Sequence, residues 1–224
     1  VPARRDARLP ESRVPSPESR IPNPESRVMV LHALSGSTPF IISLKPQSIA
    51  VSVEGTRVVS WDRGGRLYSV FDDGVTWRRG LSGQVIEKRR AGEERERVRL
   101  SDDAAGRVVE SAADVARGTL ERMGGASWQW TSAVDQVVAQ EARALLALAS
   151  RFDAAAARAD ADRFHAVFGR VGILPPDQYL SLVVQATDGC AFGSCTFCDL
   201  YHDGYRVKTP EEFRQHVADV RDYL

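Results

Sequence analysis

A series of short apolar segments between Ser48 and Arg90, each closed by a turn signal, most tightly limits how this chain can fold. The segments are rich in β-branched and aromatic residues and span 49–53, 57–61, 66–71, 75–79 and 85–88. Asp73-Gly74, between two apolar runs, is a strong hairpin signal. Parallel strands need long connections, so breaks this short predict an antiparallel β-meander that packs on neighbouring segments.

Aromatic residues in this region allow two interpretations. They could form a stacking surface for nucleic-acid bases, or supply core and cross-strand pairs. Because arginines are not concentrated on one segment, we favour the core interpretation. The residues concerned are Trp61, Tyr68, Phe71 and Trp77. Residues 89–97, where glutamates lie among arginines, likewise predict a solvated loop or strand extension instead of a basic patch.

Residues 101–172 have the composition and periodicity of helices. Ser101 can cap a first helix over 102–123, which Gly124-Gly125 ends. The apolar spacing predicts a second helix over 131–151 and an alanine-rich third over 154–168. We expect these helices to cover the domain that follows, and they contain no recognisable ligand set.

The last part of the chain predicts a strand, a loop and a helix. The apolar run 179–186 favours a buried parallel strand that ends at Asp188-Gly189. Thr209, followed by Pro210 and Glu212, has the form of a capping box at a helix start. Apolar residues at helical spacing then suit packing on a sheet, and they are Phe213, Val217, Val220 and Leu224. The segment therefore predicts one β/α unit.

The predicted loop holds the only cysteines of the sequence, Cys190, Cys195 and Cys198. Thiolates spaced C-x4-C-x2-C can all turn toward one metal centre. Structural zinc and ordinary electron-transfer clusters use four protein ligands. Three thiolates instead bind three irons of a four-iron cube and leave the fourth iron open. The count and the spacing together predict chemistry at an iron–sulfur cluster.

The residues around the cysteines resemble the entry of a radical S-adenosylmethionine (radical SAM) domain. Such domains open with an apolar strand and a Gly-Cys turn and finish the motif with Cys-x-aromatic-Cys. The matching residues are Gly189-Cys190 and Cys195-Thr196-Phe197-Cys198. Most members have a C-x3-C-x2-C spacing, and the x4 gap here matches a subset with a longer first gap. The resemblance covers residues 173–224, including a basic stretch at 204–208 that related sequences also carry.

The resemblance implies a [4Fe–4S] cluster bound by Cys190, Cys195 and Cys198, with S-adenosylmethionine (SAM) on the open iron and Phe197 beside its adenine. A reductant such as flavodoxin or ferredoxin would supply the electron that cleaves SAM to a 5′-deoxyadenosyl radical, which attacks an unidentified substrate, such as a small molecule. The family fold is a (β/α) barrel of about 200 residues or more, and 26 residues follow Cys198. The resemblance therefore implies the N-terminal part of a longer enzyme, inactive alone.

Two other classes of protein share parts of the cysteine pattern. A plant-type ferredoxin, an electron carrier, has the same spacing but needs a fourth cysteine downstream. A zinc-stabilised binding module would use His202 as its fourth ligand. We favour a histidine beside the site over a ligand at this position, and both alternatives stay open.

Composition sets the remaining expectations. Residues 1–27 contain Pro-Glu-Ser-Arg three times, which predicts a disordered tail or a repeat upstream of a true start near Met29. The 30 basic and 30 acidic residues balance, so no nucleic-acid or membrane partner is expected. Clustered cysteines in an odd number favour a reducing compartment, the cytoplasm.

The sequence thus predicts an α/β fold class: an antiparallel meander, a helical segment, and the first β/α unit of a truncated radical SAM barrel. The predicted regions are a tail at 1–27, a β-rich region at 28–100, a helical region at 101–172 and an incomplete radical SAM domain at 173–224.

Overall fold

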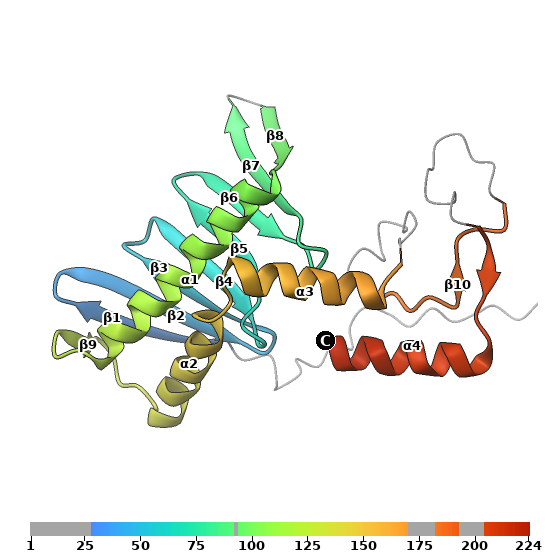
Figure 1. Ribbon diagram of the computed structural model, residues 1–224. Coiled ribbons are helices and arrows are strands. Elements are labelled where there is room, and N and C mark those ends of the chain that lie inside the picture. Colours follow the sequence, from blue (N-terminus) through green and yellow to red (C-terminus); the bar gives the residue numbers. More distant parts are fainter. Residues whose placement is uncertain (1–27, 92–93, 170–181, 193–203) are drawn as a thin grey trace, which may run out of the picture.

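The computed structural model of the chain describes residues 28–91, 94–169, 182–192 and 204–224. Among these residues, the largest feature is a nine-stranded antiparallel sheet in the order β8-β7-β6-β5-β4-β3-β2-β1-β9 (Figure 1). The strands are β1 (Met29–Ser35), β2 (Thr38–Lys45), β3 (Ser48–Val53), β4 (Arg57–Asp62), β5 (Leu67–Asp72), β6 (Val75–Arg79), β7 (Val85–Ala91), β8 (Glu94–Arg99) and β9 (Trp128–Trp130).

The meander predicted between Ser48 and Arg90 is confirmed. The predicted segments correspond to β3 through β7, and their ends differ by at most three residues. Asp73 and Gly74 form the β5–β6 turn with φ of 43° and 79°, the left-handed pair that matches the twist of a two-residue hairpin. The sheet extends beyond the prediction, because β1, β2, β8 and β9 join it. β8 arises from the mixed-charge run, for which the strand-extension interpretation is correct.

Helices α1 (Asp102–Gly124), α2 (Gln136–Ala149) and α3 (Ala154–Val167) follow the sheet, close to their predicted positions. Each begins with a side-chain cap, in which Ser101, Asp135 or Asp153 accepts a hydrogen bond from a backbone N–H of the first turn. α1 runs across one face of the sheet, and α2 and α3 both contact α1 (Figure 1).

The hydrophobic core lies between this face and the helices. Alternate residues of the strands, such as Ile42, Val51 and Val59, are completely buried in it. Ala112 and Ala116 of α1 are also fully buried, and their small side chains let the helix lie close to the sheet. Burial of each Val- or Ile-sized side chain contributes about 1.5–3 kcal/mol. Because strand residues alternate between faces, the other half of each strand points away from this core.

The predicted β/α barrel unit at 173–224 is wrong. Of the predicted parallel strand, residues 182–186 are described, and they form no strand. The pairing that follows is antiparallel: β10 (Thr187–Asp188) pairs with β11 (Arg206–Val207) in a separate two-stranded ladder. The predicted burial is wrong as well, because Leu182 and Val184 of the run are exposed. An apolar run favours burial, but nothing local in it specifies a parallel partner strand, and none pairs with it in the part of the chain that the structure describes.

The final helix, α4 (Pro210–Tyr223), is confirmed with its cap. Thr209 accepts from the N–H of Glu212, and the Glu212 carboxylate accepts from the N–H of Thr209, which completes the predicted capping box. α4 packs against α3 instead of a sheet, through Val220 and Tyr223. Of the predicted apolar stripe, Val217 and Leu224 are exposed.

Candidate functional site

The β10–β11 ladder joins the two ends of residues 189–205, which we call the cysteine loop. Thr187 pairs with Val207 and Asp188 with Arg206, and the N–H of Lys208 donates to the carbonyl of Ala186 at 3.0 Å. Of the predicted site residues, Cys190 lies in the described part of the loop. Cys195, Phe197, Cys198 and His202 lie outside the described residues. The structure therefore places one of the three predicted ligands and leaves the set untested.

Gly189, directly before Cys190, lies where the two ends of the loop come into contact. Its φ is +67°, and a Cβ atom built on it would lie 2.0 Å from the carbonyl oxygen of Gly204. A distance this short excludes any side chain, because two heavy atoms cannot approach so closely. The Gly-Cys turn that the sequence singled out is thus required by the contact between the two loop ends.

Cys190 is half-buried and not in a disulfide. The backbone N–H of Phe192 donates to its sulfur, with 3.4 Å between the two atoms. Hydrogen bonds of this kind to cysteine sulfur are among the features that set the reduction potential of iron–sulfur clusters. The local geometry around Cys190 therefore suits a metal-binding thiolate.

Asp188 anchors the base of the loop by charge. Its carboxylate accepts from Arg206 at 2.8 and 3.2 Å and also from the ammonium of Lys208. The Lys208 hydrogen bond, together with those from Arg206, holds the pKa of Asp188 below its usual value, against the opposing effect of burial. Arg206 also donates to Glu212 at 2.6 Å, so the ion-pair network connects the loop to the first turn of α4.

A cavity of about 380 Å³ lies beside this network. Its lining includes Asp188, Arg206 and Lys208 from the ladder and the buried His216 from α4. The N–H of Gln185 donates to Nε2 of His216 at 3.0 Å. From the sequence alone, the basic stretch 204–208 had no assigned role and His216 was not singled out. The signal available in the sequence was that Arg206 and Lys208 come directly before the helix start at Thr209-Pro210.

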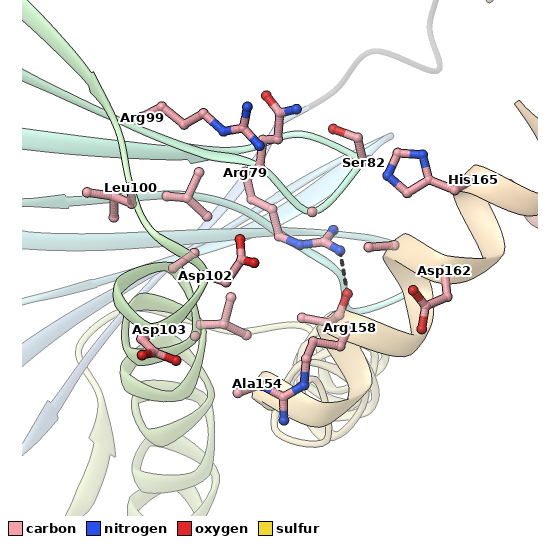
Figure 2. Close-up of a pocket in the computed structure, with 18 residues that line it drawn as sticks. Arg79, Ser82, Arg99, Leu100, Asp102, Asp103, Ala154, Arg158, Asp162 and His165 are labelled. Carbon is pink, nitrogen blue, oxygen red and sulfur yellow. Dashed lines mark hydrogen bonds between the residues drawn. The ribbon is translucent and has the colours of Figure 1, made fainter. Parts of the chain in front are cut away.

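A larger cavity, of about 490 Å³, lies where the β6–β7 turn meets the start of α1 and the side of α3 (Figure 2). Arg79 crosses it and donates to the carbonyl of Ala157 at 3.0 Å and to Asp160 at 2.9 Å. Both Asp102 and Arg158 line the cavity, so its charge favours no single ligand class. Because the Arg79 guanidinium already joins the sheet to α3, we interpret this cavity as structural.

Within the described ranges, no group of three His, Cys, Asp or Glu side chains is arranged to hold a metal ion. No helix in these ranges is both long and apolar enough to cross a membrane. A comparison with protein-family models finds no match to the chain. Comparisons with curated proteins and with solved structures also find no match.

Proposed function

We propose that the cysteine loop binds a [4Fe–4S] cluster and SAM, and that the protein takes part in radical SAM chemistry. The observation that carries this proposal is the presence of three cysteines within nine residues, on one loop whose ends are joined. Three thiolates leave one iron of a four-iron cube available to a small molecule. The proposal rests on this ligand set and on the resemblance of its flanking residues, and it assumes no barrel.

The chemistry of the described residues fits such a group. Cys190 is a free, half-buried thiol whose sulfur accepts a backbone hydrogen bond from Phe192. Gly189 permits the sharp entry into the loop. The ion pairs of Asp188 keep the loop ends together without using any thiol. A site that must hold several ligands in register benefits from supports of this kind.

In this proposal Cys190, Cys195 and Cys198 are the ligands, and Phe197 borders the adenine of SAM. When bound and reduced, the cluster supplies the electron that cleaves the sulfonium bond of SAM. The chain contributes ligation, orientation and exclusion of water. An electron donor such as a flavodoxin or ferredoxin and an unidentified substrate complete the proposed reaction.

Anaerobic reconstitution with iron and sulfide tests the ligand set. We expect about four irons and four sulfides per chain and, after reduction, an electron paramagnetic resonance signal that changes when SAM is added. Alanine at Cys190, Cys195 or Cys198 should abolish the cluster, whereas His202→Ala should leave the iron content unchanged. Zinc in a colourless protein, with loss of metal in His202→Ala, would instead establish the binding module. Two irons per chain would point to the electron carrier.

A further inference from the structure

The face of the sheet opposite the core has a strongly asymmetric charge at the β6–β8 end. Residues directly opposite each other on neighbouring strands share a face and form a row across the sheet. In one row Phe71 pairs with Thr76, Thr76 with Lys88, and Lys88 with Arg97. In the next row Arg78 pairs with Ile86, which pairs with Arg99. Four cations occupy these paired positions, and Arg90 lies on the same side of β7, two residues after Lys88. We define the basic face as these five residues: Arg78, Lys88, Arg90, Arg97 and Arg99. All except the half-buried Lys88 are exposed.

The acidic residues of the same hairpin occupy the other face. Glu87 and Glu96 alternate with the basic residues along β7 and β8, so their side chains point to the side of the sheet that α1 covers. There they are paired: Arg89 donates to Glu96 at 2.6 Å, and the indole N–H of Trp77 donates to Glu87 at 3.0 Å. Strand alternation has therefore sorted a mixed-charge sequence into one neutralised face and one basic face.

This concentration of positive charge destabilises the folded protein when no partner is bound. Lys88 and Arg97 are directly opposite each other, and like charges in that relation destabilise a sheet. Burial, followed by the positive charges of Arg78 and Arg97, lowers the pKa of Lys88. Charged side chains on an edge hairpin protect it from aggregation, but charges of both signs would serve that purpose equally well. The concentration of a single sign therefore needs another explanation, and an anionic partner supplies one.

Two exposed aromatic rings border the cations. Tyr68 is 52% and Phe71 40% exposed, large values for such residues in a sheet. The guanidinium of Arg78 lies 5.8 Å from the centre of the Tyr68 ring. In contrast, Trp61 is completely buried and Trp77 packs against the core. The core interpretation is confirmed for the two tryptophans. Tyr68 and Phe71 lie outside the core, and Phe71 occupies a cross-strand position opposite Thr76.

We propose that the basic face, together with Tyr68 and Phe71, binds single-stranded nucleic acid. The cations would contact successive phosphates, and the rings would stack on unpaired bases. An exposed sheet surface with aromatic rings and flanking cations suits single strands, because bases in a duplex are already stacked on one another. An anionic lipid surface would match the charge but would leave the position of the rings unexplained. The balanced total charge, from which no nucleic-acid partner was expected, does not argue against this proposal. A neutral chain can still have one basic surface when its opposite charges lie on different faces of a sheet.

The test is a fluorescence anisotropy titration of the full chain against a labelled single-stranded RNA of about 20 nucleotides, a length that covers a typical single-strand site. Competitors are the matching duplex, heparin as a polyanion without bases, and phosphatidylserine vesicles. We expect saturable binding that the duplex competes for less well than the single strand. Its affinity should fall with salt by about 0.7 log units per phosphate contact for each tenfold rise in salt.

Charge reversal and ring removal separate the two parts of the surface. Lys88→Glu with Arg97→Glu should weaken binding by about tenfold or more and reduce the salt slope by about 1.4, the share of two phosphate contacts. Tyr68→Ala with Phe71→Ala should weaken RNA binding by about fivefold or more while leaving heparin binding unchanged. The matched control is Arg151→Glu with Arg158→Glu, which changes the charge equally at exposed positions outside the sheet and should leave the affinity unchanged.

Stability provides a second, opposite readout. Since Lys88→Glu places an anion opposite Arg97, it should stabilise the fold while it weakens RNA binding. Failure of the folded wild-type chain to bind the RNA at low salt would overturn the proposal, as would an equal loss in the control variant. Preferential binding to phosphatidylserine vesicles that Tyr68 and Phe71 do not affect would assign the surface to a membrane instead.

Discussion

Arg79 of β6 and Asp160 of α3 form a buried ion pair, with 2.9 Å between Nη2 and Oδ2. The other oxygen of Asp160 accepts from Nε of Arg66, also at 2.9 Å. Arg66 in turn donates to the carbonyl oxygens of Tyr223 and Leu224 at the end of α4. One carboxylate thus connects the sheet to α3 and, through Arg66, to the last helix of the chain.

We expect Asp160→Ala to destabilise the protein by about 3–5 kcal/mol, because it leaves the almost fully buried Arg79 guanidinium without its counter-charge. Urea unfolding followed by circular dichroism measures the change. Asp162→Ala, an exposed carboxylate two residues away on α3, is the matched control and should change stability by less than about 0.5 kcal/mol. Equal effects of the two substitutions would show that the Arg79 pair contributes nothing specific.

A comparison of substitutions at Gly65 and Gly74 separates the free-energy cost of the backbone conformation from that of close packing. Both have positive φ, of 82° and 79°. A Cβ on Gly65 would lie 2.6 Å from the carbonyl carbon of Leu148 in α2, whereas a Cβ on Gly74 meets nothing within 4 Å. Gly74→Ala should therefore cost about 1–2 kcal/mol for the left-handed conformation alone. Gly65→Ala should cost clearly more, since it also displaces α2. Similar unfolding midpoints for the two variants would contradict the packing argument.

The raised pKa of Tyr223 predicts that the protein loses stability at alkaline pH. Burial, with the negative charge of Asp160 adding to it, raises the pKa of the Tyr223 hydroxyl to about 12, compared with about 10 in an unfolded chain. Because the folded state keeps the proton longer, the stabilisation is complete below pH 10 and declines as the pH rises toward 12. Urea midpoints measured from about pH 8 to 11 should therefore fall less steeply for Tyr223→Phe. Tyr68→Phe, at an exposed position, should behave as the wild type.

Substitution of Phe197 should change the affinity for SAM without changing the amount of bound cluster. Under the proposed function, Phe197→Ala should weaken SAM binding and leave iron close to the wild-type value, since no thiolate is changed. Phe192→Ala is the matched control, because its ring is 72% exposed and its backbone N–H to Cys190 is kept. Calorimetric titration of SAM into the reconstituted chain measures the affinity. Loss of cluster and stability together, with unchanged SAM affinity, would indicate that Phe197 is a core residue.

Features that depend on a few adjacent residues were predictable. The Asp73-Gly74 turn, the Ser101 cap and the Thr209–Glu212 capping box all arise from hydrogen bonds or φ preferences within four residues. The strands of the meander were predictable for a related reason, because short turns leave each strand only its neighbour as a partner. The grouping of three cysteines, and hence the proposed ligand set, also comes from the sequence alone.

Features that depend on the partner of a segment were decided by the tertiary structure. The apolar run 179–186 predicts a buried strand, whereas in the fold Leu182 and Val184 are exposed and an antiparallel β10–β11 ladder follows the run. Arg79 and Asp160 are 81 residues apart, and no local pattern selects that pair. The sequence of residues 89–97 is a mixture of charges, and only its assignment to paired strands places Arg90 and Arg97 on one face and Glu96, with its partner Arg89, on the other. Pairing over long separations depends on which surfaces meet in three dimensions, a property that local propensity does not encode.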